Sequence, residues 1–151
     1  MPPTEAQWEY ACRAGSASVF CYGDDPAELG RYGNFADNTL RKANANYYWA
    51  ELRADDGVGE ALAPVGSYLP NAWGLRDMHG NVAEWVLDHL VTERLGGKDP
   101  LVRVEKDGRN QVRGGAWCST AEYCESTFRN GSTGNNKYNH IGFRIVLQKV
   151  K

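Results

Sequence analysis

The sequence predicts a small α+β protein that is rich in loops, with short antiparallel strands and one or two helices. A helix-start signal stands at Thr4, and residues at helical spacing follow it. The stretch 20–70 is rich in Gly, Asp and Asn, which favour turns. Short apolar segments within 101–113 and 142–147 are typical of strands. Regular structure is therefore expected to be sparse.

The first expected element is a helix at the start of the chain. Thr4 and Gln7 have the spacing of a capping box, and Tyr10 and Ala14 recur at helical spacing. Gly15 stands where the residue after the C-cap belongs. These residues predict one short helix.

The rest of the chain predicts packed loops and three strand segments. Residues 20–70 show weak periodicity, so we expect loops with room for one further helix. Leu101–Glu105 and Gln111–Arg113, joined across Asp107–Gly108, predict a hairpin with a tight turn. Gly142–Leu147 would supply the last strand.

Length and charge limit the class of protein. A chain of 151 residues buries roughly 70% of its unfolded surface, which suits a single domain over 1–151. The net charge is −2 with both signs mixed along the chain, so nucleic acid is not an expected partner. No apolar run reaches the length of a membrane span, and the first residues lack the features of a signal peptide, so no membrane partner is expected.

Cysteine and tryptophan usage points to interior packing rather than to a disulfide or zinc framework. Four cysteines are too few for a disulfide scaffold, and their spacing matches no zinc site. Large aromatic side chains usually fill the core of a loop-rich domain. We therefore expect Trp8, Trp73 and Trp85 to be core residues.

Four tracts together resemble one known family. Gly74–Trp85, Arg113–Trp117 and Ile141–Arg144 follow one another as in the formylglycine-generating enzymes (sulfatase-modifying factors), and Pro3–Ala11 is similar to the helix start of that family. The resemblance covers nearly the whole chain, and it begins where the family's domain is already under way. It implies the C-type lectin fold in its formylglycine-generating variant. Because one scaffold can carry unrelated functions, activity has to be argued from the site.

The resemblance also implies two structural calcium sites, built from oxygen ligands in irregular loops. Without an ion the same side chains would cap turns, and both interpretations stay open. The first site would use the side chains of Asn34 and Asp56 with the carbonyls of Phe35 and Val58, and the second the side chains of Asp77 and Glu84 with the carbonyls of Gly80 and Val82.

Copper is not an expected cofactor. The enzymes of this family oxidise a substrate cysteine with copper(I) held by two cysteine thiolates, a role that Cys118 and Cys124 would have to fill. Counted from the preceding glycines, Ser119 occupies the first catalytic position and Cys118 lies one residue early. On a strand, such a shift turns a side chain to the other face.

Iron is not expected either. The related iron-dependent sulfoxide synthases take their metal from histidines of a separate helical domain, which this chain lacks. His79, His89 and His140 are isolated in sequence. We expect them to be surface or hydrogen-bonding residues rather than metal ligands.

The segment 118–140, between the last two family tracts, is the candidate binding surface. Its Tyr, Ser, Thr, Gly and Asn residues suit an exposed paratope, and equally an ordinary solvated loop. The resemblance favours the paratope, because variable proteins of diversity-generating retroelements use this fold and end in the same Gly-Phe-Arg strand. In those proteins, adenines of template Asn codons are randomised.

Most residues of this segment can be reached from an Asn codon that ends in a pyrimidine. Cys118 is then a chance product of diversification, whereas Glu122, Glu125 and Lys137 would be fixed or differently encoded. Other reachable residues include Ser119, Thr120, Tyr123, Ser126, Thr127, Phe128, Ser132, Thr133, Tyr138 and His140, while Asn130, Asn135, Asn136 and Asn139 would be unaltered template.

We therefore expect a non-enzymatic protein that binds a protein or another macromolecule through a diversified surface at about 117–140. Aromatic anchors and short polar side chains would share the contacts. The predicted ligand-binding residues are Trp117, Cys118, Ser119, Thr120, Tyr123, Glu125, Thr127, Phe128, Ser132, Asn135, Tyr138 and His140.

Two alternatives stay open. The chain would be a copper-dependent cysteine oxidase if Cys118 and Cys124 bind copper(I). It would instead be a structural fragment of a larger enzyme if the part of the family domain that precedes these tracts is essential for folding.

Overall fold

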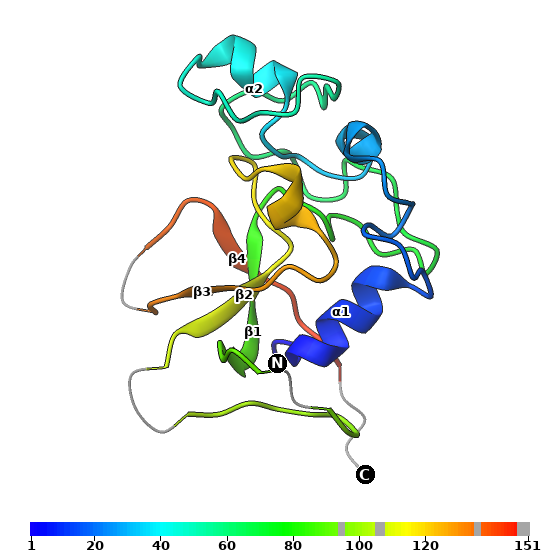
Figure 1. The fold of residues 1–151 in the computed structure, drawn as a ribbon, viewed down its shortest axis with the longest axis vertical. Helices are drawn as coiled ribbons and strands as arrows, with labels where there is room; N and C mark the ends of the chain where they lie inside the picture. The colour runs from blue at the N-terminus through cyan, green and yellow to red at the C-terminus, as the bar shows by residue number, and fades with distance from the viewer. Residues whose placement is uncertain (94–95, 105–107, 135–136, 148–151) are drawn as a thin grey trace.

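A computed structural model describes residues 1–93, 96–104, 108–134 and 137–147 (Figure 1). Helix α1 spans Glu5–Arg13 and begins with the predicted capping box, in which Thr4 accepts from the backbone N–H of Gln7. The Gln7 side chain in turn accepts from the N–H of Thr4. The helix ends at Ala14, whose φ of 47° is left-handed. The first predicted element is confirmed.

Residues 20–70 form loops with two short helical segments. These are the 3-10 helix η1 over Pro26–Arg31 and helix α2 over Asn38–Ala43. Asp37 caps α2, because its Oδ1 accepts from the backbone N–H groups of Thr39 and Leu40. The prediction of packed loops with one further helix is confirmed. None of the described helices is long and apolar enough to cross a membrane.

One four-stranded sheet forms the centre of the described fold, in the order β3-β2-β1-β4. Its strands are β1 (Ala83–His89), β2 (Asn110–Arg113), β3 (Asn130–Ser132) and β4 (Ile141–Phe143). The pairs β1–β2 and β2–β3 are antiparallel, as predicted, whereas β4 pairs parallel to β1. Strands β3 and β4 therefore lie at opposite edges of this sheet. A short 3-10 helix, η2 (Ala121–Cys124), lies between β2 and β3 in the sequence.

The predicted hairpin 101–113 is wrong in its first arm. Residues 101–104 form no strand, and Glu105 and Asp107 lie outside the described residues. The backbone of Val102 instead bonds to the end of β1, accepting from the N–H of His89 and donating to Asp88. Residues 110–113 do form a strand, but its partners are β1 and β3.

The described core consists of three apolar clusters around the sheet and loops. Trp8 is buried and confirms its predicted place, and Trp85 is half-buried. Trp73 was expected in the core, but 47% of it is exposed. Its backbone belongs to a turn in which Asn71 accepts from the N–H groups of Trp73 and Leu75, and this turn directs the indole outward against Tyr10. The clusters centre on Phe20, Leu29, Phe35, Ala54 and Cys124, on Trp8, Cys12, Met78 and Val86, and on Ala36, Leu40, Ala50 and Trp117.

Candidate binding surface

A pocket of about 260 Å³ lies at the end of the sheet, and we call it the sheet-end pocket. Its floor comes from Ala83 of β1, Val112 of β2 and the turn 114–116. Its walls come from the segment that connects β2 to β4. The predicted contact residues that line it are Cys118, Ser119, Tyr123, Phe128, Ser132, Tyr138 and His140.

Two aromatic pairs stand among the pocket walls. Tyr123 and Phe128 have ring centroids 4.4 Å apart, and Tyr138 and His140 have theirs 5.3 Å apart. The first pair lies before β3 and the second lies after it, so the fold gathers aromatic side chains that are distant in sequence. Such rings offer large contact area at low entropic cost.

Arg113 fixes the backbone below these side chains. Its guanidinium is fully buried and donates to the carbonyls of Ser126, Thr127 and Phe128 at 2.6, 3.0 and 2.5 Å. It also pairs with the carboxylate of Glu9 at 2.7 Å. A buried cation is stable only with such partners. Because these partners are Glu9 of α1 and the carbonyls of residues 126–128, Arg113 connects the pocket lining to α1. Sequence reasoning did not identify this role; the only signal was an Arg directly before two glycines.

The turn after Arg113 requires glycine. Gly115 has a φ of +70°, and a Cβ there would lie 2.5 Å from the sulfur of Cys124. Close packing of the backbone against Cys124 therefore explains glycine at this position. Trp117, two residues later, is 93% buried and packs with Leu40 and Ala50. It is therefore a core residue beneath the candidate surface and does not line the pocket.

The other predicted contacts have different positions. Thr120 lines a neighbouring hollow, and Glu125 and Thr127 are half-buried and border neither hollow. Asn135 lies outside the described residues.

A second hollow of about 310 Å³ adjoins the pocket, and we call it the Trp49 hollow. Cys118, Ser119 and Tyr123 line both spaces, and Trp49 lines the second but not the first. Trp49 belongs to the turn-rich stretch 44–50, which has no periodic pattern, so sequence reasoning missed it. Its only signal was a run of three aromatic residues.

Cys118 and Cys124 have separate environments. Cys124 is fully buried in the Phe20 cluster, whereas Cys118 is half-buried and packs against the Trp117 cluster. Burial raises the pKa of both thiols. Raised pKa values favour the neutral thiol, which is a poorer copper ligand than the thiolate.

The first predicted calcium site has oxygen atoms that suit a cation. Asn34 Oδ1 is buried without a hydrogen-bond partner among the described residues. Burial raises the pKa of Asp56 to about 7, and the nearby carboxylate of Asp37 adds to this effect. Asp56 also accepts from the N–H groups of Phe35 and Val58 at 3.1 and 2.7 Å. Buried oxygens with uncompensated negative charge fit a hard cation.

The second predicted calcium site does not fit in the same way. Asp77 Oδ1 is buried without a partner in the described chain. Both oxygens of Glu84, however, are already bonded, one to Arg144 at 2.9 Å and the other to Trp8 and Arg144 at 2.7 and 3.0 Å. A carboxylate that is neutralised by a guanidinium is not available to a cation.

The histidines serve as hydrogen-bonding residues where the structure describes their contacts. His79 is buried, donates from Nδ1 to the carbonyl of Cys124 at 2.8 Å and accepts at Nε2 from the N–H of Cys21 at 3.2 Å. Burial lowers the pKa of His79 to about 4, so the ring is neutral. No group of three or more His, Cys, Asp and Glu residues suited to a metal occurs within the described ranges.

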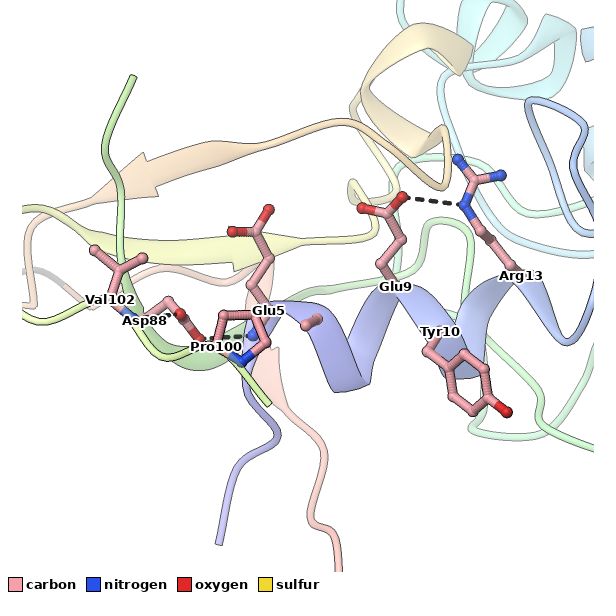
Figure 2. Close-up of a pocket in the computed structure, with 8 residues that line it drawn as sticks. Glu5, Glu9, Tyr10, Arg13, Asp88, Pro100 and Val102 are labelled. Atoms are coloured by element: carbon pink, nitrogen blue, oxygen red, sulfur yellow. Dashed lines mark hydrogen bonds and ion pairs between the residues drawn. The ribbon is translucent and has the colours of Figure 1, made fainter. Parts of the chain in front are cut away.

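A further hollow of about 320 Å³ lies beside α1 (Figure 2). It contains three carboxylates, but each has partners. Glu9 pairs with Arg13 at 3.0 Å, Glu5 pairs with Arg129 at 2.7 Å, and Asp88 accepts from the N–H of Glu5 at 2.6 Å. This hollow is therefore the surface of the ion network that holds α1 against the sheet.

The chain is similar to a family described as the sulfatase-modifying factor enzyme 1-like domain, which matches residues 2–149. It is 31% identical over 159 residues to the formylglycine-generating enzyme of Mus musculus, covering 98% of this chain and 39% of that protein. It is 30% identical over 151 residues to the inactive C-alpha-formylglycine-generating enzyme 2 of the same organism, covering 95% of this chain and 42% of that protein.

Solved structures have the same fold. Treponema denticola variable protein 1 is 28% identical with a TM-score of 0.72, covering 95% of this chain and 45% of that one. PvdO from Pseudomonas aeruginosa is 30% identical with a TM-score of 0.76, covering 95% of this chain and 50% of that one. These likenesses confirm the predicted C-type lectin fold in its formylglycine-generating variant. The chain spans from 39% to 50% of the length of the relatives described here.

Proposed function

Because this chain belongs to the sulfatase-modifying factor enzyme 1-like family, we propose that it uses the family scaffold as a non-enzymatic binding protein. Its ligand surface is the segment 117–140, which a diversity-generating retroelement diversifies. The observation that supports this proposal most directly is the sheet-end pocket, because seven of the twelve predicted contact residues line it. Among the relatives, one is named inactive and another is named a variable protein, and both names support this proposal.

The architecture suits diversification because side chains and backbone have separate supports. The buried Arg113 holds the backbone of residues 126–128, while the side chain of Phe128 faces the pocket. A substitution at Tyr123 or Tyr138 would change the surface without removing one of these backbone bonds. Binding proteins commonly carry their contact residues on loops whose backbone is held in place by a rigid scaffold.

The test is deep sequencing of this gene across its source population. We expect substitutions to concentrate in codons 117–140 and at adenine positions of a nearby template copy. Within that window, codons 117 and 124 should vary least, because Trp117 and Cys124 are core residues. Uniform low variation along the whole gene would overturn the proposal.

A copper-dependent oxidase is the second candidate. It is favoured by the identity to the mouse formylglycine-generating enzyme and by the position of Cys118 on the walls of both hollows. The measurement is competition for copper(I) at stoichiometric metal, with Cys118→Ser and Cys124→Ser variants. The oxidase requires tight binding that either variant abolishes, whereas the binding protein shows none.

We also propose that the first calcium site is a structural one. An ion at Asn34 and Asp56 would satisfy the unpartnered Asn34 oxygen and offset the buried charge of Asp37 and Asp56. Millimolar calcium should raise the melting temperature relative to a chelator, because a ligand of the folded state stabilises that state. Asp56→Asn should remove the effect. Asp55→Asn, which changes the exposed neighbour, should retain it. A shift that is equal in both variants would contradict this site.

A further inference from the structure

Trp49 forms an aromatic ridge beside the segment 117–140. Its ring contacts Tyr47 and Tyr48 edge to face, with centroids 5.3 and 4.9 Å apart. Tyr47 in turn lies 6.1 Å from the ring of the buried Trp117. Trp49 is thus held to the core on one side, while 43% of it remains exposed. An exposed side chain with this support is preorganised for contact.

Trp49 borders two hollows, and each of them has a further exposed apolar or aromatic side chain in its lining. Trp49 and Tyr123 line the Trp49 hollow together, and Trp49 and Leu52 line the hollow on its other side. Tyr48, Leu52 and Tyr123 are 77%, 61% and 42% exposed. Contiguous exposed apolar surface on a soluble protein marks an interaction site more often than scattered residues do.

The residues that line the Trp49 hollow indicate which kind of partner side chain would fit into it. No charged residue lines the Trp49 hollow, and two of its five lining residues, Trp49 and Tyr123, are aromatic. A partner side chain with a flat ring and a polar edge, such as Trp or Tyr, suits a hollow of this kind.

The border of the surface is acidic. Glu122 lines the hollow beyond Trp49, and neither Glu122 nor Glu125 forms an ion pair within the described ranges. Burial and the charge of Glu122 raise the pKa of Glu125. The cation in this region, Arg53, already pairs with Glu51 at 3.1 Å. A basic group on a partner would therefore find complementary charge here.

We propose that the ligand surface extends beyond 117–140 onto the Trp49 ridge and takes a protein partner that presents a Trp or Tyr side chain beside an Arg or Lys. The aromatic ring occupies the Trp49 hollow between Trp49 and Tyr123, and the cation lies against Glu122. This inference rests on the proposed binding function and adds to it a contact that lies outside the diversified segment.

The test is a nuclear magnetic resonance titration of the ¹⁵N-labelled chain with the dipeptide N-acetyl-Trp-Arg-amide. We expect amide shifts at 118–123 and a shift of the Trp49 indole. Trp49→Ala should weaken binding by about tenfold or more, as for an aromatic hot spot. Trp73→Ala is the matched control, because Trp73 is similarly exposed at 47% but contacts Tyr10 of α1 instead. It should leave the affinity unchanged.

Charge is tested with a second probe. N-acetyl-Trp-Glu-amide should bind more weakly than the Arg dipeptide, and Glu122→Gln should reduce this difference. Equal affinities of wild type and Trp49→Ala, or shifts confined to the Tyr10 and Trp73 region, would overturn the inference. The amide spectra of both Trp variants show whether each remains folded.

Failure of this inference can be told apart from failure of the proposed function. A Tyr138→Ala variant alters the sheet-end pocket but not the Trp49 hollow. If Tyr138→Ala weakens dipeptide binding and Trp49→Ala does not, the ridge is excluded and the diversified surface stands. If Trp49→Ala abolishes binding while the gene shows no diversification, the contact at Trp49 is supported and the proposal of a diversified surface is contradicted.

Discussion

The guanidinium of Arg113 joins α1 to the segment that bears the predicted ligand contacts. It pairs with Glu9, bonds to three consecutive carbonyls and lies 5.2 Å from the centre of the Trp8 ring. Trp8 and Glu9 belong to α1, whereas the three carbonyls belong to residues 126–128. A buried charge with this many partners fixes backbone positions more tightly than apolar packing alone, because moving any partner leaves the charge exposed to an apolar medium.

The ionisation of His79 should make a contribution to the free energy of unfolding that depends on pH. Its folded pKa is about 4, against about 6.5 for an unfolded histidine. Between these values the unfolded histidine binds more protons than the folded one, so the contribution of His79 to stability falls as the pH is lowered from about 6.5 towards 4. The raised pKa of Asp56 acts in the opposite direction over much of the same range. The loss should approach about 3 kcal/mol. The difference between wild type and a His79 variant in urea unfolding at pH 7 and pH 5 isolates this contribution from that of Asp56.

The matched variants are His79→Gln and His140→Gln. The first removes the titrating ring and should remove the loss of stability that His79 causes between pH 6.5 and pH 4, although it also loses a buried hydrogen bond. The second changes a half-buried histidine at the pocket and should leave the slope as in the wild type. An unchanged slope in His79→Gln would show that another group controls acid unfolding.

At the scale of elements, α1 depends on its capping box. Thr4→Ala removes the acceptor for the Gln7 N–H and should lower the free energy of unfolding by about 1 kcal/mol. The comparison is Thr133→Ala at an exposed loop position, which should change it by less than about 0.5 kcal/mol. Chemical denaturation of both variants gives the two values. Equal stabilities would mean that packing, rather than capping, sets the start of α1.

The elements differ in how far local sequence determined them. The capping residues of α1 act within a few positions of one another, so the prediction of this helix was confirmed. The segment 101–104 has the pattern of a strand, yet the structure uses its backbone to extend the contacts of β1 through His89 and Asp88. Hydrogen bonds to groups more than ten residues away carry no local signal.

At the scale of the whole molecule, the scaffold and the ligand surface should respond differently to substitution. A combined Tyr123→Ser, Ser132→Tyr and Tyr138→Ser variant changes three side chains that line the sheet-end pocket. We expect its free energy of unfolding to stay within about 1 kcal/mol of the wild type, because surface substitutions away from buried networks have small effects. Differential scanning calorimetry and urea titration measure this.

Trp117→Ser is the contrasting variant. Trp117 lies inside the same segment but packs with Leu40 and Ala50, so its loss should cost about 3 kcal/mol or more. If the combined surface variant is destabilised as much as Trp117→Ser, the pocket walls belong to the core and the division into scaffold and surface is wrong.

The sequence by itself determined the family and the fold, since the tracts 74–85, 113–117 and 141–144 can be read without coordinates, and the composition of 118–140 led to the proposed bounds of the ligand surface. Only the tertiary structure decided which residues line a pocket. It turned Trp117 inward and Trp73 outward, and it brought Trp49 next to Tyr123. The physical reason is that burial depends on what packs against a side chain, and for these residues the partners come from distant loops without periodic patterns.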